Sequence, residues 1–133
     1  MFTAILFFIL GLILWTVLEY GIHRWLFHGP LASEHQHHHD SPGIPQPIPL
    51  WVHAIPIVLL CWLNIPLGLG VLTGLVIYDA LHERLHHGTL EWSWLQRLKA
   101  EHTHHHKVPT TNFGLTINIW DRVAKTYRSS QNS

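Results

Sequence analysis

The sequence predicts an all-α integral membrane protein with one N-terminal transmembrane helix, a transmembrane helical hairpin and a cytosolic helical cap rich in histidine. Apolar residues make up 47% of the 133 residues and charged residues 12%, about half the charged share of an average soluble protein. Two long stretches contain no charged side chain. Thirteen of the fourteen histidines stand in four short clusters outside these stretches. Together these three observations favour a membrane protein with a polar, histidine-lined end.

The first expected element is a helix over residues 1–28. Residues 1–18 carry no charged side chain, and a membrane-spanning helix needs at least roughly 17 residues. A secretory signal peptide would need a basic start and a small-residue cleavage site, and neither occurs here. Gly29 and Pro30 end the helix. Because residues 31–47 include a proline-rich stretch, we expect them to form an extended connector near the lipid headgroups.

The second expected element is an apolar hairpin over residues 48–81. No charged residue occurs between Ile48 and Tyr78, which fits either one tilted span kinked at a proline or two limbs that turn near Asn64. Only the hairpin returns the chain to the side on which it entered. Because histidine clusters flank this stretch, one site built from all of them requires the hairpin. Its limbs of about 14–17 residues would measure roughly 21–25 Å, shorter than a bilayer core of about 30 Å.

The third element is a cytosolic helical cap over residues 82–128, which joins the others in a single domain. All eight Lys and Arg residues lie on the histidine side of the expected membrane segments. The positive-inside rule therefore predicts a cytoplasmic histidine face, in a cell inner membrane or the endoplasmic reticulum. A net charge of zero with neutral histidines gives no basic field for nucleic acid. The single cysteine excludes an internal disulfide and a cysteine-based zinc site.

The histidine clusters predict metal binding, because neutral imidazole is the commonest metal ligand and suits iron, zinc, copper and nickel. Six ligands fill one ion, and at least ten histidines are available, so more than one ion is expected. His82 and His86 share one face of an expected helix. His23 and His28 are about 140° apart around a straight helix, so they reach two adjacent ions unless the helix loosens. Two further sets stand at i, i+3 and i+4, a spacing that places all three members on one face of a helix: His35, His38 and His39, and His102, His105 and His106.

Other residues near the clusters fit the spacing less well. His37 and His104 lie outside the i, i+3, i+4 spacing, and His87 adjoins His86. We interpret His53 as a core histidine, with a role in a substrate channel as the alternative. Asn112, Phe113 and Gly114 are expected to form a turn. Because bound histidines usually donate their second N–H to a carboxylate or carbonyl, the acidic candidates for that role are Glu19, Asp79, Glu83, Glu101 and Asp121. An interfacial aromatic belt is expected from Trp15, Trp25, Trp51, Trp92 and Trp94.

Four segments in chain order resemble the histidine boxes of the fatty acid hydroxylase/sterol desaturase superfamily of membrane di-metal oxygenases. They are EYGIHRWLFH, HQHHHDSPGIPQPIP, YDALHERLHHG and LKAEHTHHHKVPTTNFGLTINIWDRV. The similarity runs from Glu19 to Tyr127. YDALHERLHHG resembles the third box of the fatty acid 2-hydroxylase branch, whereas the gap between His28 and His35 is shorter than in that branch.

The resemblance implies a non-haem di-iron site, with zinc a possible occupant in a purified sample. The ligands that it implies are His23, His28, His35, His38, His39, His82, His86, His102, His105 and His106. No catalytic residue beyond these ligands is expected, and the candidates for further ligands or ligand-orienting groups are His87, Asp79, Glu19 and Asp121. The implied partners are a lipid substrate, O2 and a separate electron donor such as a b-type cytochrome or a ferredoxin, because the chain carries no fused haem domain.

The leading functional hypothesis is a lipid hydroxylase that inserts one oxygen atom of O2 into a C–H bond. The 2-position of a fatty acyl chain is the preferred target, because of the resemblance of the YD segment. Within the superfamily, hydroxylation or desaturation of a carotenoid or sterol is the alternative. From other classes, the alternatives are a histidine-rich membrane metal transporter and a membrane adaptor with a zinc-binding face. A transporter would need ligands near the middle of the membrane, whereas here the histidines flank the apolar stretches.

Overall fold

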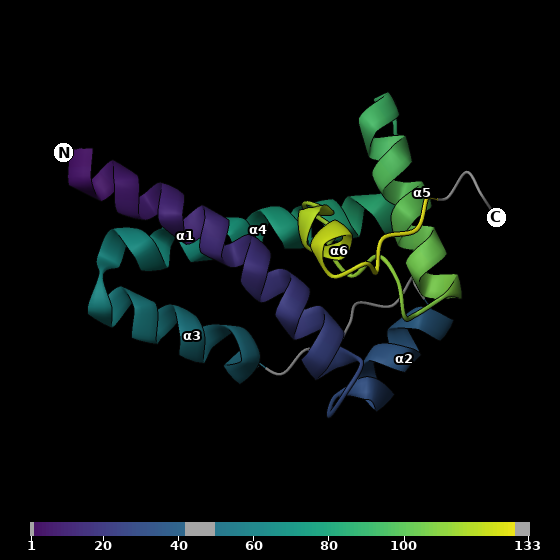
Figure 1. The fold of residues 1–133 in the computed structure, drawn as a ribbon, viewed down its shortest axis with the longest axis horizontal. Helices are drawn as coiled ribbons and strands as arrows, with labels where there is room; N and C mark the ends of the chain where they lie inside the picture. Colours follow the sequence, from purple (N-terminus) through teal and green to yellow (C-terminus); the bar gives the residue numbers. More distant parts are fainter. Residues whose placement is uncertain (1, 42–49, 130–133) are drawn as a thin grey trace.

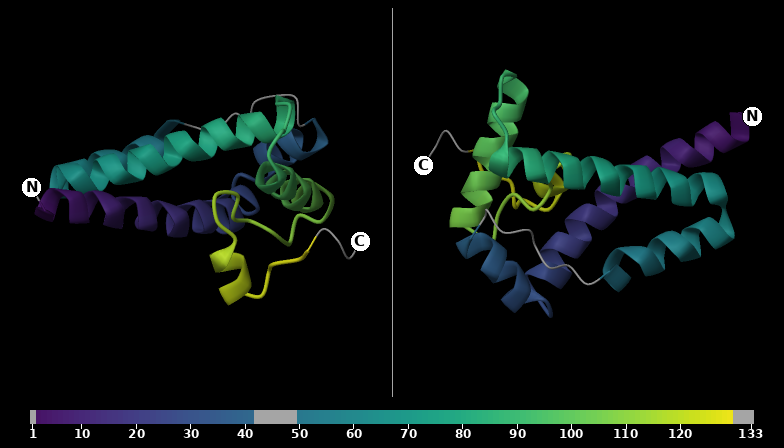
Figure 2. Two further views of the ribbon diagram at one scale, coloured as in Figure 1. Left: turned by 90° about the horizontal axis from the view of Figure 1, so that it is seen from above. Right: turned by 180° about the vertical axis from the view of Figure 1, so that it is seen from behind.

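The computed structural model describes residues 2–41 and 50–129, and all regular secondary structure in that part of the chain is helical. The elements in order are α1 (Phe2–Gly21), a π-helical turn η1 (Ile22–Phe27), α2 (Ala32–Asp40), α3 (Leu50–Leu63), α4 (Ile65–His87), α5 (Ser93–Lys107) and α6 (Ile119–Val123). Figure 1 shows α1, α3 and α4 as an elongated set of helices, which we call the apolar bundle. The other elements gather at one end of the bundle and, together with the last turns of α4 from His82 to His87, form what we call the head (Figures 1 and 2).

The apolar bundle is held by close contact between helix backbones. A β-carbon at Gly11 of α1 would overlap the carbonyl oxygen of Leu67, and one at Gly70 of α4 would overlap that of Phe8. Small residues allow this approach, which is a common way for membrane helices to pack. Beyond the glycines, the buried core continues toward and into the head through Trp15, Val71, Leu75, Tyr78, Leu85, Leu95 and Leu115.

The two apolar segments that follow the connector are separate helices. Asn64 lies between them in an extended conformation, and its side-chain oxygen accepts a hydrogen bond from the N–H of Leu67 at 3.1 Å, which caps α4. Helix α3 packs against α4 and continues through Pro56. Two helices, Phe2–Phe27 and Ile65–His87, are long and apolar enough to cross a membrane, whereas Trp51–Leu63 is shorter. That α3 and α4 cross a membrane as a hairpin, below a cytosolic cap, stays a prediction.

The structure differs from the sequence-based expectations in three places. Residues 32–40 form a nine-residue helix in place of an extended connector, because the prolines start only at residue 42; the proline-rich stretch 42–49 lies outside the described residues. Helix α4 runs without a break to His87, past the expected end of the hairpin at residue 81. Trp15 is 4% exposed in the core, so it does not belong to an interfacial belt, whereas Trp25, Trp51, Trp92 and Trp94 are exposed.

Candidate metal centre

Ten histidines converge in the head and form two groups of five. The first group contains His23, His28, His35, His39 and His105, and the second contains His38, His82, His86, His102 and His106. Within each group, one ring nitrogen from every histidine lies within 4.8 Å of the others. The ten are the residues that the sequence predicted as ligands, and no carboxylate belongs to either group among the described residues. That they bind metal stays a proposal.

Helices α2 and α5 each supply both groups. In α2, His35 and His39 face the first group while His38 faces the second. In α5, the assignment is reversed, because His102 and His106 face the second group and His105 faces the first. The i, i+4 pair therefore belongs to one group and the remaining histidine to the other, so the three histidines do not share the single face that their spacing predicts.

The π-helical turn η1 explains how His23 and His28 enter the same group. Its hydrogen bonds run over five residues, including one from the His28 N–H to the His23 carbonyl oxygen at 3.2 Å. Residues five apart therefore share a face, and the two rings stack with centroids 5.2 Å apart. Of the two alternatives that the spacing left open, the structure contains the second: the helix loosens before Gly29, and both histidines belong to the first group.

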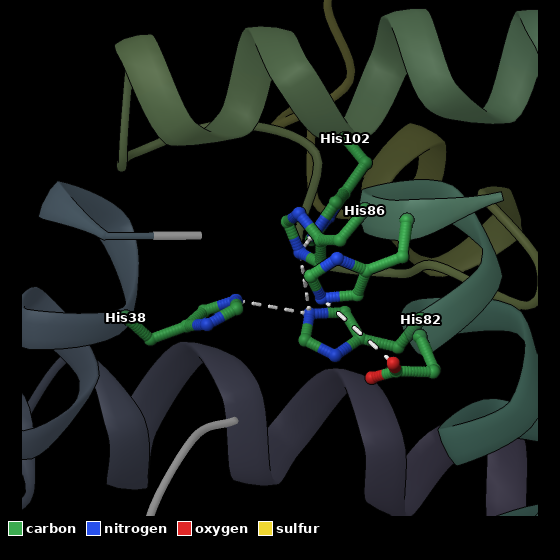
Figure 3. Close-up of polar contacts among 6 residues, drawn as sticks. His38, His82, His86 and His102 are labelled. Atoms are coloured by element: carbon green, nitrogen blue, oxygen red, sulfur yellow. Dashed lines mark hydrogen bonds and ion pairs between the residues drawn. The ribbon is translucent and has the colours of Figure 1, made fainter. Parts of the chain in front are cut away.

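The nitrogen spacing fits octahedral metal coordination. The Nε2 atoms of neighbouring rings lie 3.0–3.2 Å apart in both groups, as for His23 and His35 or His38 and His82. An ion bound at about 2.1 Å places adjacent ligand nitrogens roughly 3.0 Å apart in an octahedron and about 3.4 Å apart in a tetrahedron. Figure 3 shows rings of the second group, His38, His82, His86 and His102, turned toward one another. Five imidazoles leave one octahedral position for another ligand.

Burial keeps the rings in the neutral form that a metal ion requires. Loss of hydration lowers the pKa of His106 to about 3 and that of His28 to about 4, and nearby histidines add to the effect. The same causes hold the pKa of His102 well below its usual value. At neutral pH these imidazoles carry a free lone pair, so a cation meets no competition from bound protons.

Residues 111–116 form a loop, here called the NFG loop, that orients two histidines of the first group. The Nδ1 atom of His105 lies 2.6 Å from the carbonyl oxygen of Thr111, and Nδ1 of His23 lies 2.7 Å from that of Phe113. A carbonyl only accepts, so each ring carries its proton on Nδ1 and presents the Nε2 lone pair to the group. The Phe113 ring also contacts His23, His28 and His105, with centroids 5.4–5.8 Å apart.

Two buried carboxyl groups hold the NFG loop. Glu19 of α1 accepts the N–H groups of Leu115 and Thr116 at 2.6 and 2.9 Å and also the Thr116 hydroxyl. Asp121 of α6 accepts the N–H groups of Phe113 and Gly114 at 2.9 and 2.7 Å. From the sequence, both acids were candidates for metal ligands or for direct hydrogen-bond partners of the histidine rings. The structure places them one step further out, on the backbone that the rings contact.

The remaining acidic candidates lie away from both groups. Asp79 is exposed on α4, and Glu83 pairs with the exposed His87 at 3.8 Å. Glu101 accepts a hydrogen bond from the Tyr127 hydroxyl at 2.7 Å. None of the three contacts a histidine of either group through a hydrogen bond between described residues.

Four histidines stay outside the groups. His37 and His87 are exposed, and His104 is half-buried on the α5 side facing away. His53 of α3 is half-buried, with its ring 6.5 Å from that of Trp15, so the choice between a core and a substrate-channel role stays open.

Sequence reasoning missed the carbonyl oxygens of Thr111 and Phe113 as ligand-orienting groups. The one signal in the sequence for these carbonyl groups was the turn expected over Asn112, Phe113 and Gly114, and the structure contains this turn. Asn112 has a φ of 54°, in the left-handed region that asparagine tolerates well. Its amide donates to the Arg128 carbonyl at 2.9 Å and accepts the Arg128 N–H at 2.8 Å, which ties the C-terminal segment to the loop. The ring of Tyr78, stacked on His82 with centroids 5.6 Å apart, is a second contact that spacing alone does not predict.

Comparison with known proteins places these residues in context. A model of the fatty acid hydroxylase family matches residues 8–126. The chain is 35% identical to the ceramide very long chain fatty acid hydroxylase of Schizosaccharomyces pombe, over 90% of this chain and 42% of the relative. It is 36% identical to the dihydroceramide fatty acyl 2-hydroxylase FAH2 of Arabidopsis thaliana, over 85% of this chain and 56% of the relative.

A third relative is the fatty acid 2-hydroxylase of Rattus norvegicus, 33% identical over 86% of this chain and 37% of the relative. The chain thus spans about half, or less, of the length of these curated relatives. No solved structure gives a significant match.

Proposed function

This chain belongs to the fatty acid hydroxylase family, and we propose that its head is the catalytic centre of a membrane-bound, O2-dependent lipid hydroxylase. The curated relatives named above are hydroxylases of fatty acyl chains or ceramides. We propose a fatty acyl chain as the substrate and its 2-position as the site of hydroxylation. The alternatives within the family, a carotenoid or a sterol and desaturation in place of hydroxylation, remain to be tested on the same lipid extracts.

The observation that carries this proposal is the convergence of ten neutral imidazoles into two neighbouring groups of five. We propose two iron ions as the occupants, with zinc able to replace them during purification. Iron bound there would supply the activation of dioxygen, with two electrons from a separate donor such as a b-type cytochrome or a ferredoxin. The chain itself contributes nitrogen ligands, one open coordination position per group and the backbone carbonyls that fix two rings.

The position of the head at one end of the apolar bundle supports a lipid substrate. Tyr78 of the bundle core stacks directly on His82 of the second group, and Trp15 contacts Tyr78 edge-on at 5.9 Å. The second group thus adjoins the apolar core directly. We propose that an acyl chain lying along the bundle reaches it from the membrane. We propose that α1 and the α3–α4 pair lie in the membrane with the histidine face toward the cytoplasm, where a soluble donor can dock.

A metal transporter is the main rival from another class. Transport needs ligands along a path through the membrane-spanning helices. In residues 50–78, which contain α3 and most of α4, His53 is the single histidine, and both groups of five lie in the head. This placement favours a catalytic centre over a conduction path, and the order of the four histidine segments favours it over a zinc-binding adaptor.

The test is co-expression of the full chain with an electron donor, followed by mass spectrometry of extracted acyl chains and a count of iron per chain. We expect acyl species heavier by one oxygen atom, which His82→Ala and His105→Ala abolish. His37→Ala is the matched control, because His37 lies on α2 but outside both groups, and it should retain activity. Unchanged lipids together with metal flux in vesicles would instead support the transporter.

A further inference from the structure

The contacts of the NFG loop are confined to one of the two histidine groups. Both rings that bond to its carbonyl oxygens, His23 and His105, belong to the first group. The three histidines that contact the Phe113 ring also belong to the first group. No ring of the second group bonds to the loop, whose residues the structure describes completely. The loop therefore supports the first group and leaves the second without this support.

The second group borders an open cavity. Its volume is about 300 Å³, and His86, His102 and His106 line it together with Lys99 and Thr103. No histidine of the first group lines this cavity. Water and small chelators thus have a path to three ligands of the second group, of which His86 and His106 are half-buried and His102 is 7% exposed. In the first group His28 is half-buried as well, whereas His23, His35 and His105 are 3%, 3% and 0% exposed.

We infer that the two metal positions are unequal: the NFG loop, fixed by Glu19 and Asp121, retains the ion of the first group, while the ion of the second group exchanges through the cavity. This inference rests on the proposed function, since it requires that both groups bind metal. Glu19 and Asp121 are positioning residues, because they act on the rings through the loop backbone. Removal of the direct hydrogen-bond partner of a ligating histidine typically changes metal affinity 10–100-fold, and loss of either acid would displace the carbonyls that are those partners.

The hydrogen-bond pattern separates conservative substitutions at the two acids. One oxygen of Glu19 accepts both backbone N–H groups and the other accepts only the Thr116 hydroxyl. In Glu19→Gln, the amide oxygen keeps the two N–H groups and the hydroxyl rotates to accept from the new amide, so the loop survives. In Asp121, each oxygen accepts a different backbone N–H. In Asp121→Asn, the side-chain NH2 group must therefore face a backbone N–H. Two donors cannot form a hydrogen bond, so the loop loses one of its two contacts with residue 121 and is no longer held in place.

The experiment is to load the full chain in detergent with zinc and follow the release of zinc to an excess of a colorimetric chelator. The wild type should release one ion per chain quickly and the second slowly. His82→Ala should lack the fast phase and His23→Ala the slow one, which assigns the phases to the groups. Glu19→Ala and Asp121→Asn should accelerate the slow phase about 10–100-fold and leave the fast phase unchanged. Glu19→Gln should behave as the wild type.

Glu83→Gln is the matched control, because this exposed carboxylate of α4 pairs with His87 and does not touch the loop. It should change neither phase. A single release rate for both ions in the wild type would overturn the inference while leaving the proposed function intact. Equal acceleration of both phases by Glu19→Ala, or a defect in Glu19→Gln as large as in Glu19→Ala, would also overturn it. Failure to bind zinc or iron at all would instead count against the proposed function.

Discussion

In the apolar bundle, α1 and α4 approach so closely at Gly11 and Gly70 that no β-carbon fits between them, whereas in the head the elements meet through imidazole and carboxyl groups. The bundle contacts are made by uncharged backbone and apolar side chains, which do not respond to protons or metal. The head contacts depend on histidines whose protonation and ligation both change with the solution. The two regions should therefore respond differently to metal, mutation and pH, and four experiments compare them.

The largest difference should follow metal loading. When free zinc exceeds the dissociation constant 1,000-fold, each occupied site stabilises the folded state by about 4 kcal/mol. Hydrogen exchange should show this protection in α2, α5 and the NFG loop, which surround the two groups. Protection in α1 near Gly11 should change little. Equal protection along the whole bundle would mean that the head and bundle unfold as one unit.

The next largest effect should come from overpacking the bundle. Gly70→Leu forces α1 and α4 apart and should destabilise the protein by about 3 kcal/mol, because its side chain meets the Phe8 backbone. Thermal unfolding in detergent measures the loss, with Leu69→Val on the exposed side of α4 as the control. The folded fraction should still bind two ions per chain. A parallel loss of metal would show that the packing of the bundle shapes the head.

A pH only slightly below 6.5 should weaken the metal-free head to a smaller extent, and the loss should grow as the pH approaches 4. The folded-state pKa values of His28, His102 and His106 lie below the ordinary value of 6.5. Between the folded and unfolded pKa values the unfolded chain binds more protons, so stability falls as the pH falls through 6.5 toward about 4. The midpoint of thermal unfolding should decrease over this range, and metal should shift the decrease to lower pH. The destabilisation caused by Gly70→Leu should be the same at each pH.

The smallest effect should come from the histidines outside the groups. His37→Ala removes an exposed side chain on α2 and should change stability by less than about 0.5 kcal/mol. Metal content measured by atomic absorption should stay at the wild-type value. A loss of one ion would show that His37 is a ligand, which would contradict its place outside both groups.

The second group could be predicted from the sequence better than the first. His82 and His86, like His102 and His106, are spaced four apart on regular helices, so the local period alone places each pair on one face. The first group depends on the π-helical turn that brings His23 and His28 together and on the distant NFG loop. The extra residue in a π turn leaves no clear mark in the sequence, and a loop contact over 90 residues has no period.

The roles of the acidic residues were also difficult to predict from the sequence. Their number and position suggested ring partners, and spacing could not show that Glu19 reaches the backbone of Leu115 and Thr116, 96 and 97 residues away. The helical fold class and the ten clustered histidines follow from local composition and spacing, which the sequence records directly. The route by which the carboxyl groups act depends on tertiary contacts, which it does not record.

The crosswise use of α2 and α5, in which each helix sends two rings to one group and one to the other, has a geometric consequence. The pitch of these two helices contributes to the separation of the two histidine groups, and no acid among the described residues belongs to either group. A twist of either helix about its axis would draw ligands from both positions at once. A movement of a whole helix, unlike a change in the NFG loop, would therefore displace rings of both groups together.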